Sequence, residues 1–493
     1  MNACQAVFSV VCASVLLIGC GSSPYQSEKW VTDTELRQKH LDELLSTAAA
    51  HEPSSLDPAK DLVLLRSDSV APLAAVSVTG ELQSIADELS NSWMGKPCNC
   101  QVRVGPQFGF GGFTYPNGTI VIQAGTLEHL DTQDELAALL AHELAHLWLD
   151  HHDKNELQSA AKGVADFAQA VAMLGNDAKA RETTLRMGGS TDALVAAAGF
   201  TQWNRTQETE ADLLAAKILE KSRYSPMAMI ALLTKLNKGQ GEASVDASAY
   251  DEMAKATAKK LKKEDTEISD NQVQKWLSTV SSDLAGGDYL SPQERRQIVR
   301  AVIYGLEGAT LARSFSSLEL DLDELSPVIT LKSIHELEST PTSYQALIDR
   351  ALASEPENLH LLLISFRGLI VRGAHPQATK LAEAFIRRPD TTFSALSAAT
   401  QYLDQYNVLA AEQRKMLMHM AVAKLVELDL PDAYAADKYY LSTRYEVPVH
   451  GVLNEKLCIA RTGKVKVRER CELAKKALEA DSSFYQALAR AGL

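Results

Sequence analysis

The ten residues LLAHELAHLW (139–148) carry the strongest indication of fold in this chain. Their Ala and Leu content favours a helix, and His142 and His146 stand four residues apart within it. At that spacing both imidazoles lie on one face, one turn apart, close enough to share a metal ion. Glu143 is offset from His142 by about 100° around the helix axis. Its carboxylate can therefore hold a water beside the metal instead of becoming a third ligand.

The His-Glu-x-x-His motif fixes only three of five positions, so a chance copy with two ordinary surface histidines is an alternative. The flanking sequence favours a metal site over a chance copy of the motif. The β-prone runs 110–115 and 119–123 enclose Pro-Asn-Gly at 116–118, which predicts a β-hairpin. After the hairpin, Asp131 or Thr132 can cap the helix that carries the histidines.

Other periodicities predict a mainly α-helical chain with a small β-hairpin or sheet. Residues 34–50 form an amphipathic stretch, which predicts a first helix after a polar tether within 20–60. Apolar residues at helical spacing predict a second helix over 78–93, and 101–104 alternate as a short strand.

Length and charge limit the class of protein. The chain has 493 residues, 46% hydrophobic and 23% charged, with a net charge of -14. This length predicts about three domains, and the composition is that of a soluble globular protein. Nucleic acid is not an expected partner, because no strongly basic stripe is available to neutralise phosphates.

The first twenty residues predict export. Residues 8–19 are apolar and too short to span a bilayer, which is typical of a signal peptide, although 1–5 lack the usual Lys or Arg. Leu-Ile-Gly-Cys at 17–20 resembles a bacterial lipobox. The resemblance implies removal of 1–19 and lipidation of Cys20, with acyl chains anchoring an otherwise soluble protein. The residue after Cys20 is Gly21 and not an aspartate, which would suggest retention in the inner membrane, so we expect the lipidated protein in the outer membrane.

The remaining cysteines agree with an oxidising compartment. Cys98, Cys100, Cys458 and Cys471 form an even set. A disulfide between Cys458 and Cys471 is plausible across an expected turn. Cys98 and Cys100 could close only a tight ring, and free thiols are the alternative. A four-cysteine zinc site is disfavoured because the two pairs lie in distant segments.

Four segments carry a resemblance to a known family. They are YPNGTIVI (115–122), GTL (125–127), DELAALLAHELAH (134–146) and RTQETEAD (205–212). In this order they resemble the gluzincin zinc metallopeptidases that contain HtpX, the CAAX prenyl proteases and the BepA-like periplasmic proteases. The resemblance covers residues 78–303, within an expected metallopeptidase domain at 61–310.

The resemblance implies one zinc ion per chain held by His142, His146 and Glu208, with a fourth position open for water. Glu143 would act as the general base. Glu210 is the alternative ligand, but it points about 200° away from Glu208 around the helix. Asp212 matches a family aspartate that serves as a proton donor or as a partner of a ligating histidine.

Two further residues belong to the candidate site. Arg205 matches a family arginine and would steady Glu208 or Asp212, or bind the substrate oxyanion. His151 follows His146 without a glycine to break the helix, so it points about 140° away and is expected near the metal ligands or at the surface.

The chain also departs from its relatives. It lacks the membrane spans of HtpX and the CAAX proteases, which favours the soluble periplasmic branch, and it carries a charged insertion at 239–287. The element Tyr-Leu-Ser-Pro at 289–292 has no histidine where BepA-like proteins carry one, so regulation by a histidine that plugs the metal site is in doubt.

Residues 329–493 have helical periodicity throughout. Similar segments at 351–356 and 384–389 repeat at 33 residues, with a third at 477–482, close to the 34 of tetratricopeptide repeats. We predict degenerate repeats of this kind in about four helix pairs, with a concave surface for a polypeptide.

Together these features predict a lipid-anchored zinc endopeptidase on the periplasmic side of the outer membrane, acting on unfolded or misassembled envelope proteins. The strand at 119–123 is a candidate edge for extended substrates. The repeats could contact the outer-membrane protein assembly machinery. A chaperone or assembly factor with restrained proteolysis is the alternative, and a purely structural lipoprotein is a third choice.

Overall fold

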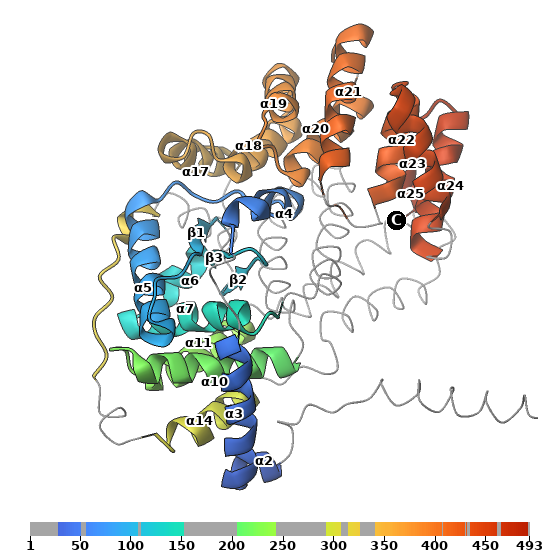
Figure 1. Ribbon diagram of the computed structural model, residues 1–493. Coiled ribbons are helices and arrows are strands. Elements are labelled where there is room, and N and C mark those ends of the chain that lie inside the picture. The colour runs from blue at the N-terminus through green and yellow to red at the C-terminus, as the bar shows by residue number, and fades with distance from the viewer. Residues whose placement is uncertain are drawn as a thin grey trace, which may run out of the picture.

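The computed structural model describes residues 28–50, 56–106, 110–151, 205–242, 292–306, 314–325, 341–406, 408–428, 430, 434–460 and 465–491. This part of the chain is mainly helical with one small sheet, which confirms the predicted fold class (Figure 1). The signal peptide, Cys20 and nearly all of the insertion at 239–287 lie outside the described residues. The predicted domain boundaries stay predictions.

The first half of the chain surrounds the sheet with helices. Its elements in chain order are α2 (Glu28–Thr32), α3 (Thr34–Ala50), η3 (Pro58–Asp61), α4 (Leu62–Ser67), α5 (Val76–Met94), β1 (Gln101–Gly105), β2 (Gly112–Thr114), β3 (Thr119–Gln123), α6 (Ala124–His129), α7 (Gln133–Trp148), α10 (Arg205–Lys221), α11 (Met227–Glu242), α14 (Pro292–Ile303) and η4 (Leu322–Glu324). The helices predicted over 34–50 and 78–93 are both present, as α3 and α5.

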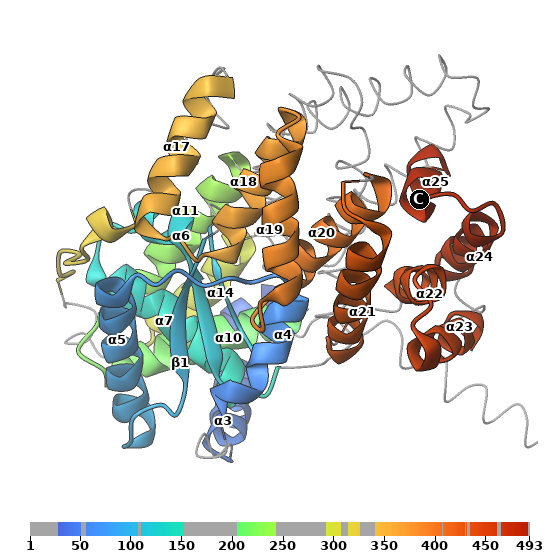
Figure 2. The same cartoon turned by 90° about the horizontal axis from the view of Figure 1, so that it is seen from above.

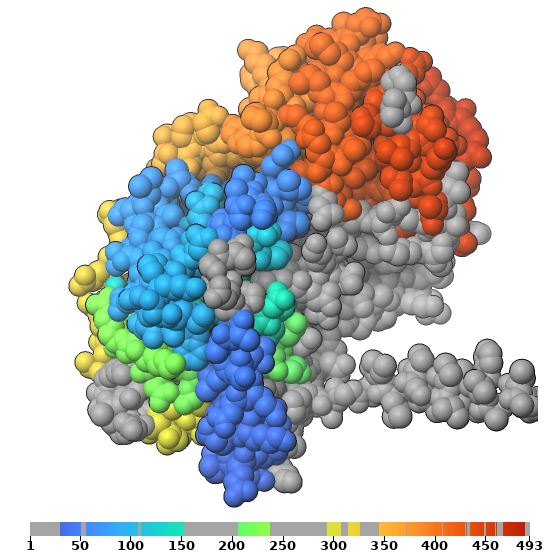
Figure 3. Space-filling view, in the orientation of Figure 1, coloured from blue at the N-terminus to red at the C-terminus, as the bar shows by residue number. Residues whose placement is uncertain are grey.

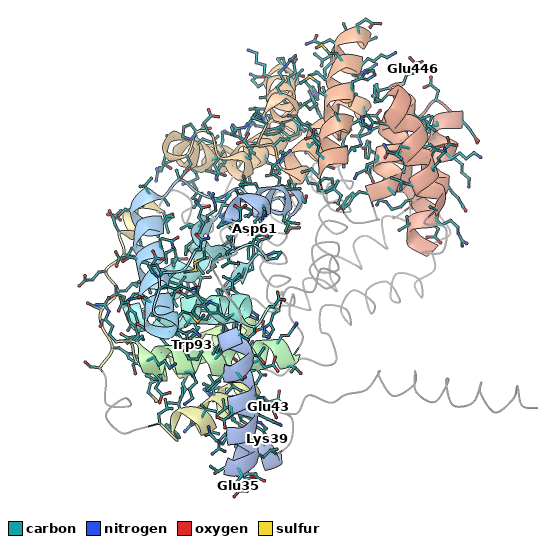
Figure 4. The ribbon with its side chains drawn as sticks, in the orientation of Figure 1. Glu35, Lys39, Glu43, Asp61, Trp93 and Glu446 are labelled. Atoms are coloured by element: carbon teal, nitrogen blue, oxygen red, sulfur yellow. A yellow bond between two sulfur atoms is a disulfide. The ribbon has the colours of Figure 1, made fainter. Side chains whose placement is uncertain are left out.

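The sheet has the order β1-β3-β2. The expected hairpin forms between β2 and β3, which pair antiparallel, while β1 pairs parallel with β3. Gly118 takes the left-handed φ of 102° that the turn requires. Buried Asp61 accepts from the backbone N–H groups of Asn117 and Thr119 and so fixes this turn against η3 (Figure 4).

The expectation that β3 is an edge strand is wrong. Each side of β3 is already paired, one with β1 and the other with β2, so its backbone groups have no side left for a substrate. All five of its residues are buried. The continuous apolar run Ile120–Ile122 in the middle of β3 fits this central position better than an edge.

Helix α7 lies at the centre of the first hydrophobic core. Thr132 and Glu135 form a capping box at its start, each side chain bonding to the other's backbone N–H. Every residue from Asp134 to Trp148 is buried, because α5, α10, α11 and the β2 strand pack around it. A helix covered on all sides holds its side chains in fixed positions.

The described elements from residue 341 onward are all helices. They are α17 (Pro341–Ser354), α18 (Leu359–Val371), α19 (His375–Arg387), α20 (Phe393–Gln405), α21 (Ala411–Glu427), α22 (Ala435–Arg444), α23 (Pro448–Ala460), α24 (Val465–Glu479) and α25 (Phe484–Ala491). From α17 to α22 they follow one another across the molecule (Figures 1 and 2). The three similar sequence segments fall at the ends of α17, α19 and α24. Their kinship to tetratricopeptide repeats stays a prediction.

The two halves meet along a linking segment, residues 62–75. Its Leu65 and Val70 cover the outer face of the sheet against Phe113. On its other side Arg66 Nε donates to the carbonyl of Thr391 at 3.0 Å, and the space-filling view shows this part of the chain touching the C-terminal helices (Figure 3). No helix among the described residues is long and apolar enough to cross a membrane.

Candidate active site

Two helices bring three metal-ligating side chains together. His142 and His146 project from one face of α7 toward α10, which supplies Glu208. The Nε2 atoms of the two histidines are 3.1 Å apart. Glu208 Oε2 lies 3.8 Å from His142 Nε2, and Glu208 Oε1 lies 3.5 Å from His146 Nε2. All three side chains are buried.

These distances fit one tetrahedral ion. Ligands about 2.0–2.1 Å from zinc in a tetrahedron are roughly 3.3 Å from one another. The two Nε2 atoms are near that separation, and each lies within 3.8 Å of one oxygen of the Glu208 carboxylate. Two imidazoles and a carboxylate are also the donor set of catalytic zinc sites. As metal ligands both Nε2 atoms would present lone pairs, and a cation between them would remove the repulsion of those lone pairs. The site can therefore hold Zn²⁺ with His142, His146 and Glu208.

Glu143 is placed beside this cluster by β2. Its side chain is buried, and Thr114 Oγ1 donates to Glu143 Oε2 at 2.7 Å. Gly112 crosses directly over the carboxylate, since a Cβ at that position would lie 3.0 Å from Glu143 Oε1. Burial raises the pKa of Glu143 to about 7, although His142 and the Thr114 hydrogen bond favour the ionised form. A carboxyl with this pKa can both accept and return a proton near neutral pH.

Asp212 and Arg295 contact the metal-ligating side chains. Asp212 Oδ1 lies 3.0 Å from His142 Nδ1, which matches the predicted role as partner of a ligating histidine. Arg295, on α14, contacts both oxygens of Asp212 and also reaches Glu208 Oε2 at 2.7 Å. Burial alone would raise the pKa of Asp212, but the charge and hydrogen bonds of Arg295 and His142 hold it below its usual value.

His151 also lies at the site, and the predicted orientation 140° away from His146 is wrong. Helix α7 ends at Trp148, and Asp150 adopts a left-handed φ of 52°. The N–H of His151 then bonds back to the carbonyl of His146 at 3.1 Å, and that of Asp150 to the carbonyl of Leu147 at 3.3 Å. Aspartate tolerates this conformation, so no glycine is needed.

The structure thus assembles His142, Glu143, His146, His151, Glu208 and Asp212. Arg205 is the first residue of α10, and its side chain lies outside the described part. Sequence reasoning missed Thr114, Gly112 and Arg295. Arg295 follows the element 289–292 in which the histidine is absent, and its burial at 4% exposure together with its contacts to Asp212 and Glu208 separates it from Arg296. These signals require the fold.

The four cysteines among the described residues pair as two disulfides. One joins Cys458 on α23 to Cys471 on α24, and the other joins Cys98 to Cys100 just before β1. The first agrees with the expected pairing across the turn between two helices. The second closes the tight ring, so the free-thiol alternative does not apply to this structure.

A histidine pair one turn apart, a carboxylate from a second helix and a glutamate held beside them define a metallopeptidase of the gluzincin class. Residues 108–283 match peptidase family M48, and the chain contains an M48 metallopeptidase domain. Members of this family are zinc-dependent.

Part of the chain is also similar to curated proteins. The chain is 26% identical over 129 residues to the beta-barrel assembly-enhancing proteases of Escherichia coli strain K12 and of Shigella flexneri. The matched region covers 25% of this chain and 25% of each relative. This chain therefore matches about a quarter of the length of those proteins.

Proposed function

We propose that this protein is a zinc endopeptidase of the bacterial envelope that hydrolyses peptide bonds in unfolded or misassembled polypeptides. The observation that carries the proposal is Glu143, which is buried, held by Thr114 and adjacent to three converging metal ligands. A surface His-Glu-x-x-His copy would have neither the third ligand nor the buried base. The M48 match supports the same reaction class.

The catalytic roles follow from these contacts. Zinc held by His142, His146 and Glu208 would polarise the scissile carbonyl and lower the pKa of a water. The Glu143 carboxylate accepts a proton from the attacking water as its oxygen bonds to the carbonyl carbon. Glu143 then gives that proton to the leaving amine when the carbon–nitrogen bond breaks.

Strand β2 is the proposed substrate platform, in place of β3. The backbones of Gly111 and Tyr115 bond to β3, so those of Gly112 and Thr114 point to the opposite edge. An extended chain that pairs there would lie beside the strand against which the Glu143 carboxylate packs, since a Cβ at Gly112 would lie 3.0 Å from Glu143 Oε1. Backbone pairing selects extended, unfolded segments over a particular sequence.

The location and partners belong to the same proposal. A lipid on Cys20 would tether the enzyme to the periplasmic side of the outer membrane, and the C-terminal helices would act as degenerate tetratricopeptide repeats that contact polypeptides or the outer-membrane protein assembly machinery. The name of the relatives, beta-barrel assembly-enhancing protease, supports this setting. It equally supports the second candidate function, an assembly factor with restrained proteolysis.

One variant separates these functions. Glu143→Gln keeps the size of the side chain and the three metal ligands but removes the base. We expect it to bind zinc as the wild type does and to lose at least about 100-fold in cleavage of an unfolded protein substrate. Retained cleavage would overturn the role of Glu143. Full rescue of envelope integrity by Glu143→Gln in cells lacking the gene would favour the assembly factor.

A further inference from the structure

His146 has a defined partner on the side of its ring away from the metal ligands. Its Nε2 atom faces His142 Nε2 and Glu208 Oε1, while its Nδ1 atom lies 3.0 Å from Nδ1 of His151. The Nε2 atom of His151 in turn lies 3.2 Å from Glu210 Oε2. The two rings meet edge to face with centroids 5.1 Å apart.

The donor and acceptor roles in this series of side chains are fixed by the carboxylate of Glu210 at one end and the ligand nitrogen of His146 at the other. A carboxylate can only accept, so His151 Nε2 carries a hydrogen toward Glu210. A ligand nitrogen must present a lone pair, so the hydrogen of neutral His146 is on Nδ1. His151 Nδ1 accepts that hydrogen. Every group in the series has one role, and no other tautomer satisfies both contacts.

The backbone holds this arrangement in place. The left-handed Asp150 turns the chain so that the N–H of His151 bonds to the carbonyl of His146. His151 is consequently joined to His146 through both main chain and side chain. It is 5% exposed, which excludes water as a competing partner for most of the ring.

Helix α10 also supplies a carboxylate that contacts the Nδ1 side of His142. Asp212 contacts His142 Nδ1 directly, and Glu210 reaches His146 through His151. Both carboxylates lie within one turn of the ligand Glu208. We propose that Glu210, through His151, is a positioning residue that sets the tautomer and ring orientation of His146 for metal binding. The proposal rests on the proposed function in taking His146 as a zinc ligand.

The test measures zinc affinity, by competition with a chromophoric chelator, in the full chain. We expect His151→Phe, which keeps a ring but has no acceptor, and Glu210→Leu each to weaken zinc binding by about 10- to 100-fold. The double variant should be no weaker than the weaker single variant by more than about twofold, because both changes remove one series of hydrogen bonds. Glu210→Gln retains an acceptor oxygen and should restore most of the affinity.

Glu220→Leu is the matched control. Glu220 is on the same helix, pairs with Lys217 and is 27% exposed in its side chain, against 26% for Glu210. We expect wild-type zinc affinity for this variant. The absorption spectrum of the Co²⁺-substituted protein gives a second readout, which should change in Glu210→Leu and not in Glu220→Leu.

Equal zinc affinities of Glu210→Leu and Glu220→Leu, or additive losses in the double variant, would overturn the proposal. If His151→Phe fails to fold, the comparison of the two glutamate variants alone decides. A wild-type protein that binds zinc but cleaves nothing would instead count against the proposed function and leave these affinities interpretable.

Discussion

The guanidinium of Arg295 contacts both carboxylate oxygens of Asp212, with Nε 2.7 Å from Oδ2 and Nη2 2.8 Å from Oδ1. Its third nitrogen reaches Glu208. One arginine from α14 therefore neutralises part of the charge of two buried carboxylates of α10, and this pairing orients the acidic side of the metal site.

Removing that guanidinium should destabilise the fold, because the two buried carboxylates lose the positive charge that pairs with them. We expect Arg295→Met to lower the free energy of unfolding of the zinc-free protein by about 3–5 kcal/mol at neutral pH, measured by urea titration. The loss should shrink as the pH falls through the folded-state pKa of Asp212, because Arg295 holds that pKa down and the ionised form is the one it stabilises. Arg300→Met on the exposed face of α14 is the control. A loss that does not depend on pH would contradict this role.

The hydrogen bond from Thr114 should tune the general base. Thr114→Val removes the donor that favours ionised Glu143, so the pKa of Glu143 should rise further. Because the base acts in its ionised form, the acidic limb of kcat/KM should move to higher pH by about one unit. A pH profile with a fluorogenic peptide measures the shift. Thr114→Ser retains the donor and should leave the limb in place, and a shift in the opposite direction would refute the assignment.

The choice of third ligand can be tested directly. We expect Glu208→Ala to lower zinc occupancy far more than Glu210→Ala, because only the Glu208 carboxylate lies among the imidazole nitrogens. Metal content after dialysis against a weak chelator gives the comparison. Equal loss in the two variants would show that the carboxylate ligand has been misassigned.

Gly112 should be intolerant of any side chain. An added Cβ would lie 2.8 Å from Ile122 Cδ1, 3.0 Å from Glu143 Oε1 and 3.1 Å from the carbonyl oxygen of Val121. We expect Gly112→Ala to displace β2 or the carboxylate and to reduce kcat by about 10- to 100-fold, with zinc content unchanged. Gly80→Ala on α5 meets no atom within 4 Å and should keep full activity. Wild-type activity of Gly112→Ala would argue against β2 as the wall of the site.

The predicted lipid anchor can be tested by cell fractionation. If Cys20 is lipidated, Cys20→Ala should move the protein from the membrane fraction to the soluble periplasmic fraction, since the acyl chains supply the attachment. Immunoblots of fractionated cells expressing the full chain report the distribution. Unchanged membrane association would rule out Cys20 as the anchor.

Local pattern was sufficient for much of this protein. The spacing of His142 and His146, the candidate caps Asp131 and Thr132, and Pro-Asn-Gly at 116–118 act within a few residues of chain. Their consequences were predictable because a helix or hairpin has a fixed period and fixed end requirements. The mainly helical fold class followed from the same periodicities.

Resemblance to a family, and not local pattern, selected Glu208 and Asp212. No spacing rule connects α10 to α7, since their approach depends on packing. Sequence reasoning was wrong about β3 because an apolar strand does not reveal which strands pair on its two sides. It placed His151 near the metal ligands or at the surface but was wrong about its direction, because a single left-handed residue, Asp150, reverses the direction of the chain.

By itself, then, the sequence determined the helix that bears His142, Glu143 and His146, the hairpin before it and the caps at its start, all of which are set by short-range hydrogen bonds and periodicity. Only the tertiary structure decided that Thr114 and Gly112 border the base, that Arg295 joins Asp212 to Glu208, and that Glu210 reaches His146 through His151. These contacts connect residues from separate elements, and the burial that brings them together is a property of the packed core as a whole.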